Sequence, residues 1–335
     1  MSGPVGIVGL GLVGGSLARL LAARGVDVVA TDTDAATRTD ARAVGLRVAD
    51  DLADLCAAGP EVVVLAVPLR AVRATAVELA PLLAGGDATL TDVGSVKGPV
   101  RSAVLAAGLG DRYVGAHPMA GTEHSGFAAS DAGLLDGAPW AVTVAEPGAA
   151  APDEPRRLAQ VLRLVTGPLA GTAAVVTDDR HDEAAALVSH VPHVLATQLL
   201  NAVAGAPVRD LALGLAAGSF RDGTRVALTD PARTEAMVTE NAAWVAPALR
   251  KVVRDLEVVI GALETNGSLH DVFHAADDVR ELRAGGRPRP AGPEDALPVG
   301  DGWTAGAVDA LVARCTAGAV VVGVDDAAVR VRAPR

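Results

Sequence analysis

A glycine-rich motif near the N-terminus constrains the fold of this chain more than any other feature. An apolar run over residues 5–8 leads into Gly-Leu-Gly-Leu-Val-Gly at residues 9–14, and an amphipathic run over residues 17–23 follows at once. This order predicts a strand, a tight turn and a helix, in which the first glycine permits the turn, the second lets a pyrophosphate approach and the third allows close packing. Because a helix N-terminus also offers N–H groups to phosphates, we expect a dinucleotide site lined by Gly9, Gly11, Leu12, Val13 and Gly14.

A carboxylate further along the chain favours this interpretation over a purely structural glycine turn. Asp32 follows a second apolar run, over residues 26–31, at the distance typical of the acidic residue that binds the adenosine ribose. A carboxylate accepts a hydrogen bond from a free 2′-hydroxyl and repels a 2′-phosphate, so Asp32 favours NAD over NADP as the cofactor. Arg38, on the segment that follows, is a weak argument for NADP. Val67 and Pro68 end the third apolar run, over residues 61–68, and are expected to line the same site.

Apolar runs alternate with helical patterns up to about residue 177. The later runs cover residues 61–68, 88–93, 113–116, 140–144 and 173–176. They predict an α/β fold with a Rossmann-like doubly wound sheet, in which ligands bind beyond the carboxyl ends of the strands. From residue 178 the strand-like runs give way to long helical runs, which predict an all-helical domain.

The predicted organisation therefore has four parts. They are a dinucleotide-binding domain (1–177), a helical domain (178–284), a flexible linker rich in Gly and Pro (285–302) and a short C-terminal tail (303–335). Within the tail, residues 305–315 fit a short helix and residues 319–331 fit a hairpin.

The composition excludes several classes of partner. The net charge of −11 argues against nucleic acid and against an anionic membrane surface. Cys56 and Cys315 form no metal or redox pattern, so we expect a reducing cytoplasm. We expect no membrane span, because no stretch of the sequence has the required length and hydropathy. Since a dinucleotide is anionic, its site in so acidic a chain needs locally concentrated positive charge.

Three side chains at predicted strand ends are candidates for chemistry. His117 is either a packing histidine or a general base beside the cofactor, since neutral imidazole titrates near pH 7. Ser95 is able to donate to a substrate oxygen, or to cap the next helix. Lys97 is either an incidental surface charge or one of the local cations that an anionic ligand requires.

The helical half contributes two further clusters. Pro192 lies within Ser-His-Val-Pro-His at residues 189–193, where it is expected to kink the helix, and we expect His190 to face the cleft. A metal site is disfavoured, because His190 and His193 have no third ligand at suitable spacing. Arg221, Asp222 and Arg225 form either a surface salt bridge or a clamp for a substrate carboxylate.

Five motifs in this order resemble the prephenate/arogenate dehydrogenase family of tyrosine biosynthesis. They are the glycine motif with Gly15-Ser16, Thr-Asp-Val-Gly-Ser-Val-Lys at 91–97, His-Pro-Met-Ala-Gly-Thr-Glu at 117–123, the 189–193 motif and Phe-Arg-Asp-Gly-Thr-Arg at 220–225. The resemblance covers roughly residues 5–265. The glycine motif alone fits many dehydrogenases, whereas the two histidine motifs together are specific.

The resemblance implies NAD-dependent oxidative decarboxylation of prephenate to 4-hydroxyphenylpyruvate by a homodimer that pairs through its helical domain. It implies that His117 accepts the proton of the ring hydroxyl, that Ser95 assists, and that Arg225 binds a substrate carboxylate. The other substrate contacts are then expected from His190, Lys97, Arg221, Asp222, Thr122 and Glu123. The alternatives are an arogenate dehydrogenase, a dehydrogenase of 4-amino-4-deoxyprephenate, and a non-catalytic NAD-binding sensor.

Overall fold

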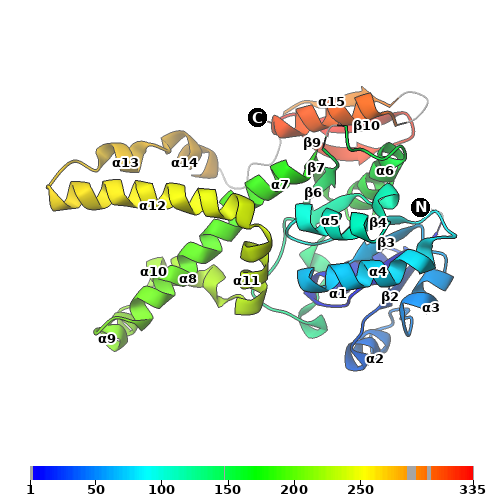
Figure 1. Ribbon diagram of the computed structural model, residues 1–335, viewed down its shortest axis with the longest axis horizontal. Coiled ribbons are helices and arrows are strands. Elements are labelled where there is room, and N and C mark those ends of the chain that lie inside the picture. The colour runs from blue at the N-terminus through cyan, green and yellow to red at the C-terminus, as the bar shows by residue number, and fades with distance from the viewer. Residues whose placement is uncertain (1–2, 147, 285–291, 300–302, 335) are drawn as a thin grey trace.

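The computed structural model describes residues 3–146, 148–284, 292–299 and 303–334, and it has an α/β body with a helical arm (Figure 1). The first sheet of the body is parallel, with strand order β2-β1-β3-β4. Its strands are β1 (Val5–Val8), β2 (Val28–Thr31), β3 (Val62–Leu65) and β4 (Thr89–Asp92). Every residue of these strands is buried, as expected of a parallel sheet that helices cover on both faces.

Five helices connect and cover these strands. They are α1 (Leu12–Ala23), α2 (Ala35–Ala43), α3 (Leu52–Ala57), α4 (Val72–Leu83) and α5 (Gly98–Ala106). Leu17 and Leu21 of α1 pack with Val5 in one hydrophobic core, while Leu79 of α4 packs with Val63 in a second core on the opposite face. The predicted Rossmann-like α/β fold followed by a helical domain is thus confirmed.

A second, mixed sheet continues the body beside β4. Its strand order is β5-β6-β7-β9-β10-β8, with β5 (Gly115–Pro118) antiparallel to β6 (Pro139–Val144), and β6 parallel to β7 (Thr172–Thr177). Helix α6 (Glu154–Thr166) connects β6 to β7 and packs on both strands. The body is therefore less regular than a single parallel sheet.

The C-terminal residues correct two of our expectations. The helix α15 (Ala305–Thr316) and the antiparallel pair β9 (Val320–Val324) and β10 (Ala328–Arg332) form as predicted, yet they are not a separate tail. Val321 pairs with Ala173 of β7, and Leu311 is fully buried in the core of the first domain. Part of the predicted flexible linker is strand β8 (Glu294–Pro298), paired with β10, while residues 285–291 and 300–302 lie outside the described residues.

One long helical segment leads from the body into the arm. It comprises α7 (Asp178–Ala185), a π-helical turn η5 (Ala186–His190) and α8 (Val191–Ala204). The π turn directly precedes Pro192, the predicted site of a kink, and α8 begins with this proline in its first turn. Pro192 therefore stands where an N–H group is not required.

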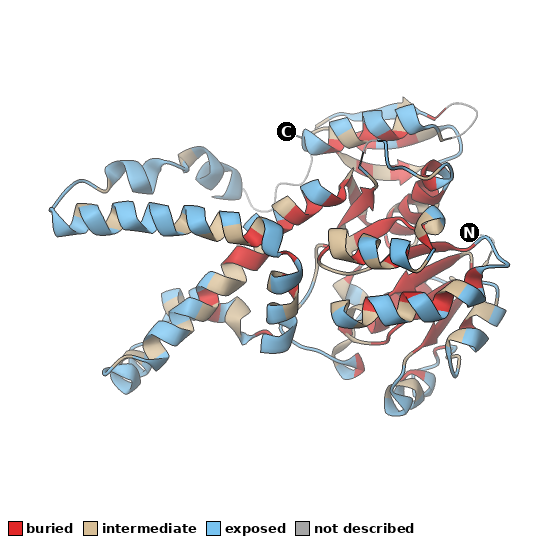
Figure 2. Cartoon of the chain, in the orientation of Figure 1, coloured by how far each residue is buried: buried red, intermediate tan, exposed pale blue. Residues whose placement is uncertain are grey.

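Six further helices complete the arm. They are α9 (Arg209–Gly214), α10 (Gly218–Thr224), α11 (Pro231–Glu240), α12 (Ala242–Glu264), α13 (His270–His274) and α14 (Asp277–Ala284). Figure 2 shows that the arm is largely exposed, and its exposed residues include Leu211, Leu256, Ile260 and Phe273. Among the described residues, no helix combines the length and the hydropathy that crossing a membrane requires.

Candidate functional site

The glycine turn between β1 and α1 has the geometry of a phosphate-binding loop. Gly9 has φ +98°, and a Cβ there would lie 2.6 Å from the carbonyl oxygen of Ala66, while a Cβ on Gly14 would lie 2.0 Å from the oxygen of Gly9. A Cβ on Gly11 would meet no atom within 4 Å, so the backbone faces open space there. Helix α1 begins after Gly11 with no side-chain cap, which leaves its N-terminal amides to a ligand. The turn therefore fits a dinucleotide.

Asp32 lies beside this turn, where the ribose interpretation requires it. Its carboxylate accepts hydrogen bonds from the backbone amides of Leu10 (2.7 Å) and Asp34 (2.9 Å). Arg38 donates to the carbonyl oxygens of Asp32 (2.7 Å) and Thr33 (3.1 Å), so this guanidinium stabilises the turn after β2. Arg38 thus has a structural task that does not require a 2′-phosphate.

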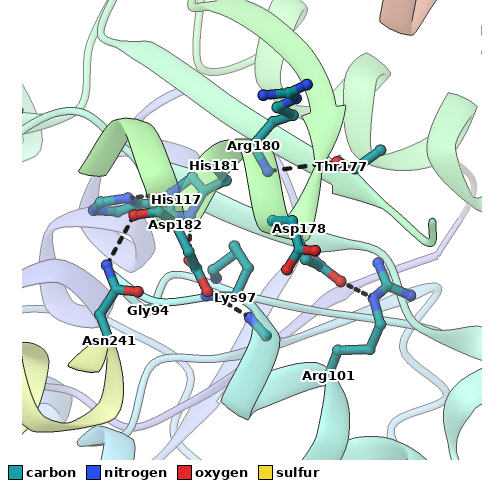
Figure 3. Close-up of polar contacts among 12 residues, drawn as sticks. Gly94, Lys97, Arg101, His117, Thr177, Asp178, Arg180, His181, Asp182 and Asn241 are labelled. Atoms are coloured by element: carbon teal, nitrogen blue, oxygen red, sulfur yellow. Dashed lines mark hydrogen bonds and ion pairs between the residues drawn. The ribbon is translucent and has the colours of Figure 1, made fainter. Parts of the chain in front are cut away.

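His117, His181 and Asp182 form a hydrogen-bonded triad at the junction of the body and the arm (Figure 3). His117 lies on β5, and its Nδ1 is 2.9 Å from Nε2 of His181 on α7. His181 Nδ1 is 2.7 Å from Oδ1 of Asp182, and the same carboxylate accepts from the backbone amides of Lys97 (2.8 Å) and Gly98 (2.9 Å). Asp182 therefore caps α5 and orients His181 at the same time.

The hydrogen bonds of the triad assign its tautomers. Burial raises the pKa of Asp182, but the bonds from His181, Gly98 and Lys97 outweigh it, so the pKa of this carboxyl lies below its usual value. An ionised Asp182 accepts from Nδ1–H of His181, which leaves His181 Nε2 to accept from Nδ1–H of His117. His117 Nε2 is then unprotonated. Burial, followed by the neighbouring His181, holds the pKa of His117 well below 6.5, so this base stays neutral at physiological pH.

Lys97 does not stand where we expected it. It is 0% exposed, and its ammonium contacts the carboxylate of Asp92 and the carbonyl oxygen of Ala116. The expectation of a substrate-binding cation at Lys97 is therefore wrong for this structure, because the charge is already neutralised in the interior.

Ser95 lies between β4 and α5, but the alternative that it caps α5 is also wrong, since Lys97 is the N-cap residue and Asp182 binds the first amides.

His190 is buried rather than open to a cleft, which corrects another expectation. It is 0% exposed, and its Nδ1 lies 3.0 Å from Nδ2 of Asn241, which also donates to the carbonyl oxygen of Asp182 at 2.8 Å. Burial lowers the pKa of His190 to about 4. Nε2 of His190 is buried without a hydrogen-bond partner. Its N–H group is therefore available only to a ligand that reaches the interior.

The expected clamp lies on the surface of the arm. Arg221 and Asp222 on α10 are 80% and 77% exposed and form an ion pair of 3.6 Å, and Arg225, at the start of the 3-10 helix η6 (Arg225–Leu228), is also exposed. No hydrogen bond or ion pair within the described ranges joins Arg225 to His117. The arrangement thus resembles the surface salt bridge, and a role as a clamp stays a prediction.

The loop after β5 links the body to the arm. Arg233 of α11 donates to the carbonyl oxygens of Thr122 (2.9 Å) and His124 (3.4 Å). The exposed Glu123 stands between these two carbonyls. The arm therefore contacts the segment that directly follows His117, which brings Thr122 and Glu123 to the boundary between the two halves.

Sequence reasoning missed His181, Asp182 and Asn241. His181 and Asp182 lie in the helix directly after β7, but β7 runs antiparallel to β5, so reasoning from strand ends does not bring them to His117. The described residues contain no group of three or more His, Cys, Asp or Glu side chains arranged to hold a metal ion.

Two family models cover most of the chain. The model described as "Prephenate dehydrogenase, nucleotide-binding domain" matches residues 17–176, and "Prephenate dehydrogenase, dimerization domain" matches residues 177–274. The chain belongs to the prephenate dehydrogenase family. The match confirms the resemblance and the dinucleotide-binding prediction.

Individual relatives carry different substrate names. The chain is 35% identical to the cyclohexadienyl dehydrogenase of Zymomonas mobilis over 76% of this chain and 86% of that protein. It is similar to the A. aeolicus prephenate dehydrogenase solved with hydroxyphenyl propionate and NAD+ (29% identity, TM-score 0.74, 84% of this chain and 98% of that one). It is equally similar in sequence to the Synechocystis arogenate dehydrogenase (29% identity, TM-score 0.69, 83% and 99%). The chain is thus a dehydrogenase of this family.

Proposed function

We propose that this protein catalyses the NAD-dependent oxidative decarboxylation of prephenate to 4-hydroxyphenylpyruvate. The observation that carries the proposal is the triad, which leaves His117 Nε2 as an unprotonated, neutral base at the junction of the two halves. The glycine turn and Asp32 support NAD as the cofactor, as does the NAD+ complex of the A. aeolicus neighbour.

The roles of the residues follow from the balance of the reaction. Bound NAD supplies the acceptor for the hydride that leaves C4 of the cyclohexadienol ring. His117 Nε2 takes the proton of the C4 hydroxyl, which increases the hydride-donating power of C4. The bond to the ring carboxylate then breaks, its electrons enter the ring as carbon dioxide leaves, and the phenolate oxygen takes a proton back.

The triad also stabilises the charge that develops on His117. When Nε2 is protonated, Nδ1–H still donates to His181, and the ionised Asp182 offsets the new positive charge through His181. Ser95 is the proposed second donor to the ring hydroxyl. We propose Arg225 for a substrate carboxylate, with Arg221, Asp222, Thr122 and Glu123 near it, because the contact of Arg233 holds the arm against the loop after β5.

Arogenate is the second candidate substrate, and the likeness to the Synechocystis enzyme favours it. Arogenate carries the same ring and C4 hydroxyl, so the triad serves it equally well. The amino analogue of prephenate would present an amine to His117 instead. A non-catalytic sensor has no use for a neutral base held by two further residues, so the triad disfavours that alternative.

We further propose that the protein is a homodimer. The dimerisation-domain model covers the arm from α7 to α13, and this arm exposes Leu211, Leu256, Ile260 and Phe273. Exposed apolar area of this extent favours burial against another protein surface.

The decisive experiment follows NADH absorbance with purified protein, NAD and each of the three substrates in turn, and repeats the series with NADP. We expect turnover with prephenate and NAD, and its loss in a folded His117→Asn variant. Turnover of arogenate alone, or of the amino analogue alone, would show that this compound and not prephenate is the substrate. No NADH from any substrate, with NAD binding intact, would refute the proposal in favour of the sensor.

A further inference from the structure

The two strands that carry the proposed site belong to different sheets. Strand β4 leads to Ser95 and β5 carries His117, but β4 is the edge of the parallel sheet and β5 the edge of the mixed one. Within the described residues they meet at an isolated bridge between Leu90 and Tyr113, with Val114 N–H donating to Leu90 at 3.0 Å. A continuous ladder therefore does not fix the distance between Ser95 and His117.

A buried cluster of Asp92, Lys97 and Tyr113 spans this junction instead. Asp92 ends β4, and its carboxylate accepts from the ammonium of Lys97, the hydroxyl of Tyr113 (2.7 Å) and the amide of Gly94 (2.6 Å). Lys97 also donates to the carbonyl oxygen of Ala116 at 2.7 Å, directly before His117. The carboxylate thus holds Gly94, next to Ser95, directly, and it holds Ala116, next to His117, through Lys97.

The cluster is well satisfied and closed to solvent. Asp92 and Tyr113 are each 1% exposed, and Lys97 is 0% exposed. Burying an ion pair costs desolvation, and the cost is offset only where the remaining donors and acceptors are also bonded, as they are here. Removal of one partner leaves an uncompensated buried charge, so the cluster holds its geometry more firmly than an exposed pair would.

We propose that the Asp92–Lys97–Tyr113 cluster sets the position of His117 relative to Ser95, and that Lys97 is a positioning residue which never contacts substrate. The inference rests on the proposed function, because it concerns the geometry of the same base. The ammonium has a second effect, since after burial and His181 it is the next cause of the lowered pKa of His117.

Chemical labelling tests the burial of Lys97 without any turnover. The chain has two lysines, Lys97 and Lys251. We expect acetic anhydride to modify Lys97 in the denatured protein and to leave it unmodified in the native protein, whether or not NAD and prephenate are present. Lys251, whose side chain is 69% exposed, serves as the internal control for reagent activity. Labelling of native Lys97 that prephenate prevents would overturn the proposal, since it would make Lys97 a substrate ligand.

Kinetics of matched lysine variants test the positioning role. Lys251→Met breaks an exposed pair with Asp255 and is the control, with unchanged kcat. Lys97→Met should lower kcat by about 100-fold, as a displacement of roughly 1 Å at a reacting group does, while KM for prephenate changes less than threefold. The acidic limb of its pH profile should also move to higher pH. A large rise in KM with kcat unchanged would overturn the proposal.

Tyr113→Phe keeps the test decisive if Lys97→Met does not fold. This variant removes one donor to Asp92 but keeps the ion pair and the packing of the ring. We expect a fall in kcat of about 3- to 10-fold with an unmoved pH profile, and an unchanged kcat would contradict the proposed cluster. A wild-type protein without turnover would instead refute the proposed function, and native labelling would still report on Lys97.

Discussion

Replacement of Asp182 by Asn is the most informative perturbation of the triad. The carboxylate accepts three hydrogen bonds, from His181 and Lys97 on Oδ1 and from Gly98 on Oδ2. An amide supplies one oxygen and one NH2 group, so one of the two backbone N–H groups must lose its acceptor in either orientation of the side chain. If the NH2 group faces His181, that ring carries its proton on Nε2, and His117 Nε2 becomes protonated and can no longer act as a base.

The magnitude follows from this loss. General base catalysis contributes about 10²- to 10⁴-fold, so kcat should fall by that factor, or about 3–5 kcal/mol in the activation free energy. One unpaired buried N–H group should lower the free energy of unfolding by about 1–3 kcal/mol. The assay is NADH formation at saturating NAD and prephenate, with the NAD dissociation constant and the melting temperature measured in parallel.

Two further variants make the result interpretable. Asp179→Asn alters an exposed carboxylate in the first turn of the same helix, α7, and should leave kcat unchanged. In the double variant with His117→Asn, the Asp182 substitution should cause little additional loss, because residues that act as a unit are strongly non-additive. A folded Asp182→Asn protein with nearly normal kcat, or fully additive losses in the double variant, would refute the triad.

Three other predictions follow from the arm, the interior and the C-terminal strands. Arg225→Ala should raise KM for prephenate by the equivalent of about 1.5–3 kcal/mol of binding free energy with little change in kcat, and an unchanged KM would contradict a role of Arg225 as a clamp. Because the pKa of His190 is about 4 when folded and near 6.5 when unfolded, the unfolded state alone binds a proton between these values. The free energy of unfolding should therefore decrease as the pH is lowered below 6.5, by about 2 kcal/mol at pH 5. Urea unfolding at each pH measures this decrease, which should be smaller in His190→Gln. Leu311→Ala should cost about 2–5 kcal/mol on denaturant unfolding, against a negligible change for the exposed Leu105→Ala, if the C-terminal strands belong to the main core.

The sequence determined the elements of this protein and the place of its dinucleotide site. Glycine positions, apolar runs and Asp32 act over short stretches of chain, so the turn before α1 and the strands of the first sheet were readable from local patterns. The position of His117 at a strand end was likewise a local property, because the apolar run over residues 113–116 ends directly before it.

Only the tertiary structure decided what the polar residues contact. His117 and His181 are 64 positions apart, and Lys97 and Asp182 are 85 apart, so no local pattern pairs them. The residue type does not tell whether a lysine or a histidine lines a cleft or lies in the interior. Only the packing of α5, α7 and α12 shows that Lys97 and His190 are buried. The C-terminal strands join the first domain for the same reason: edge pairing between distant segments is a property of the folded sheet.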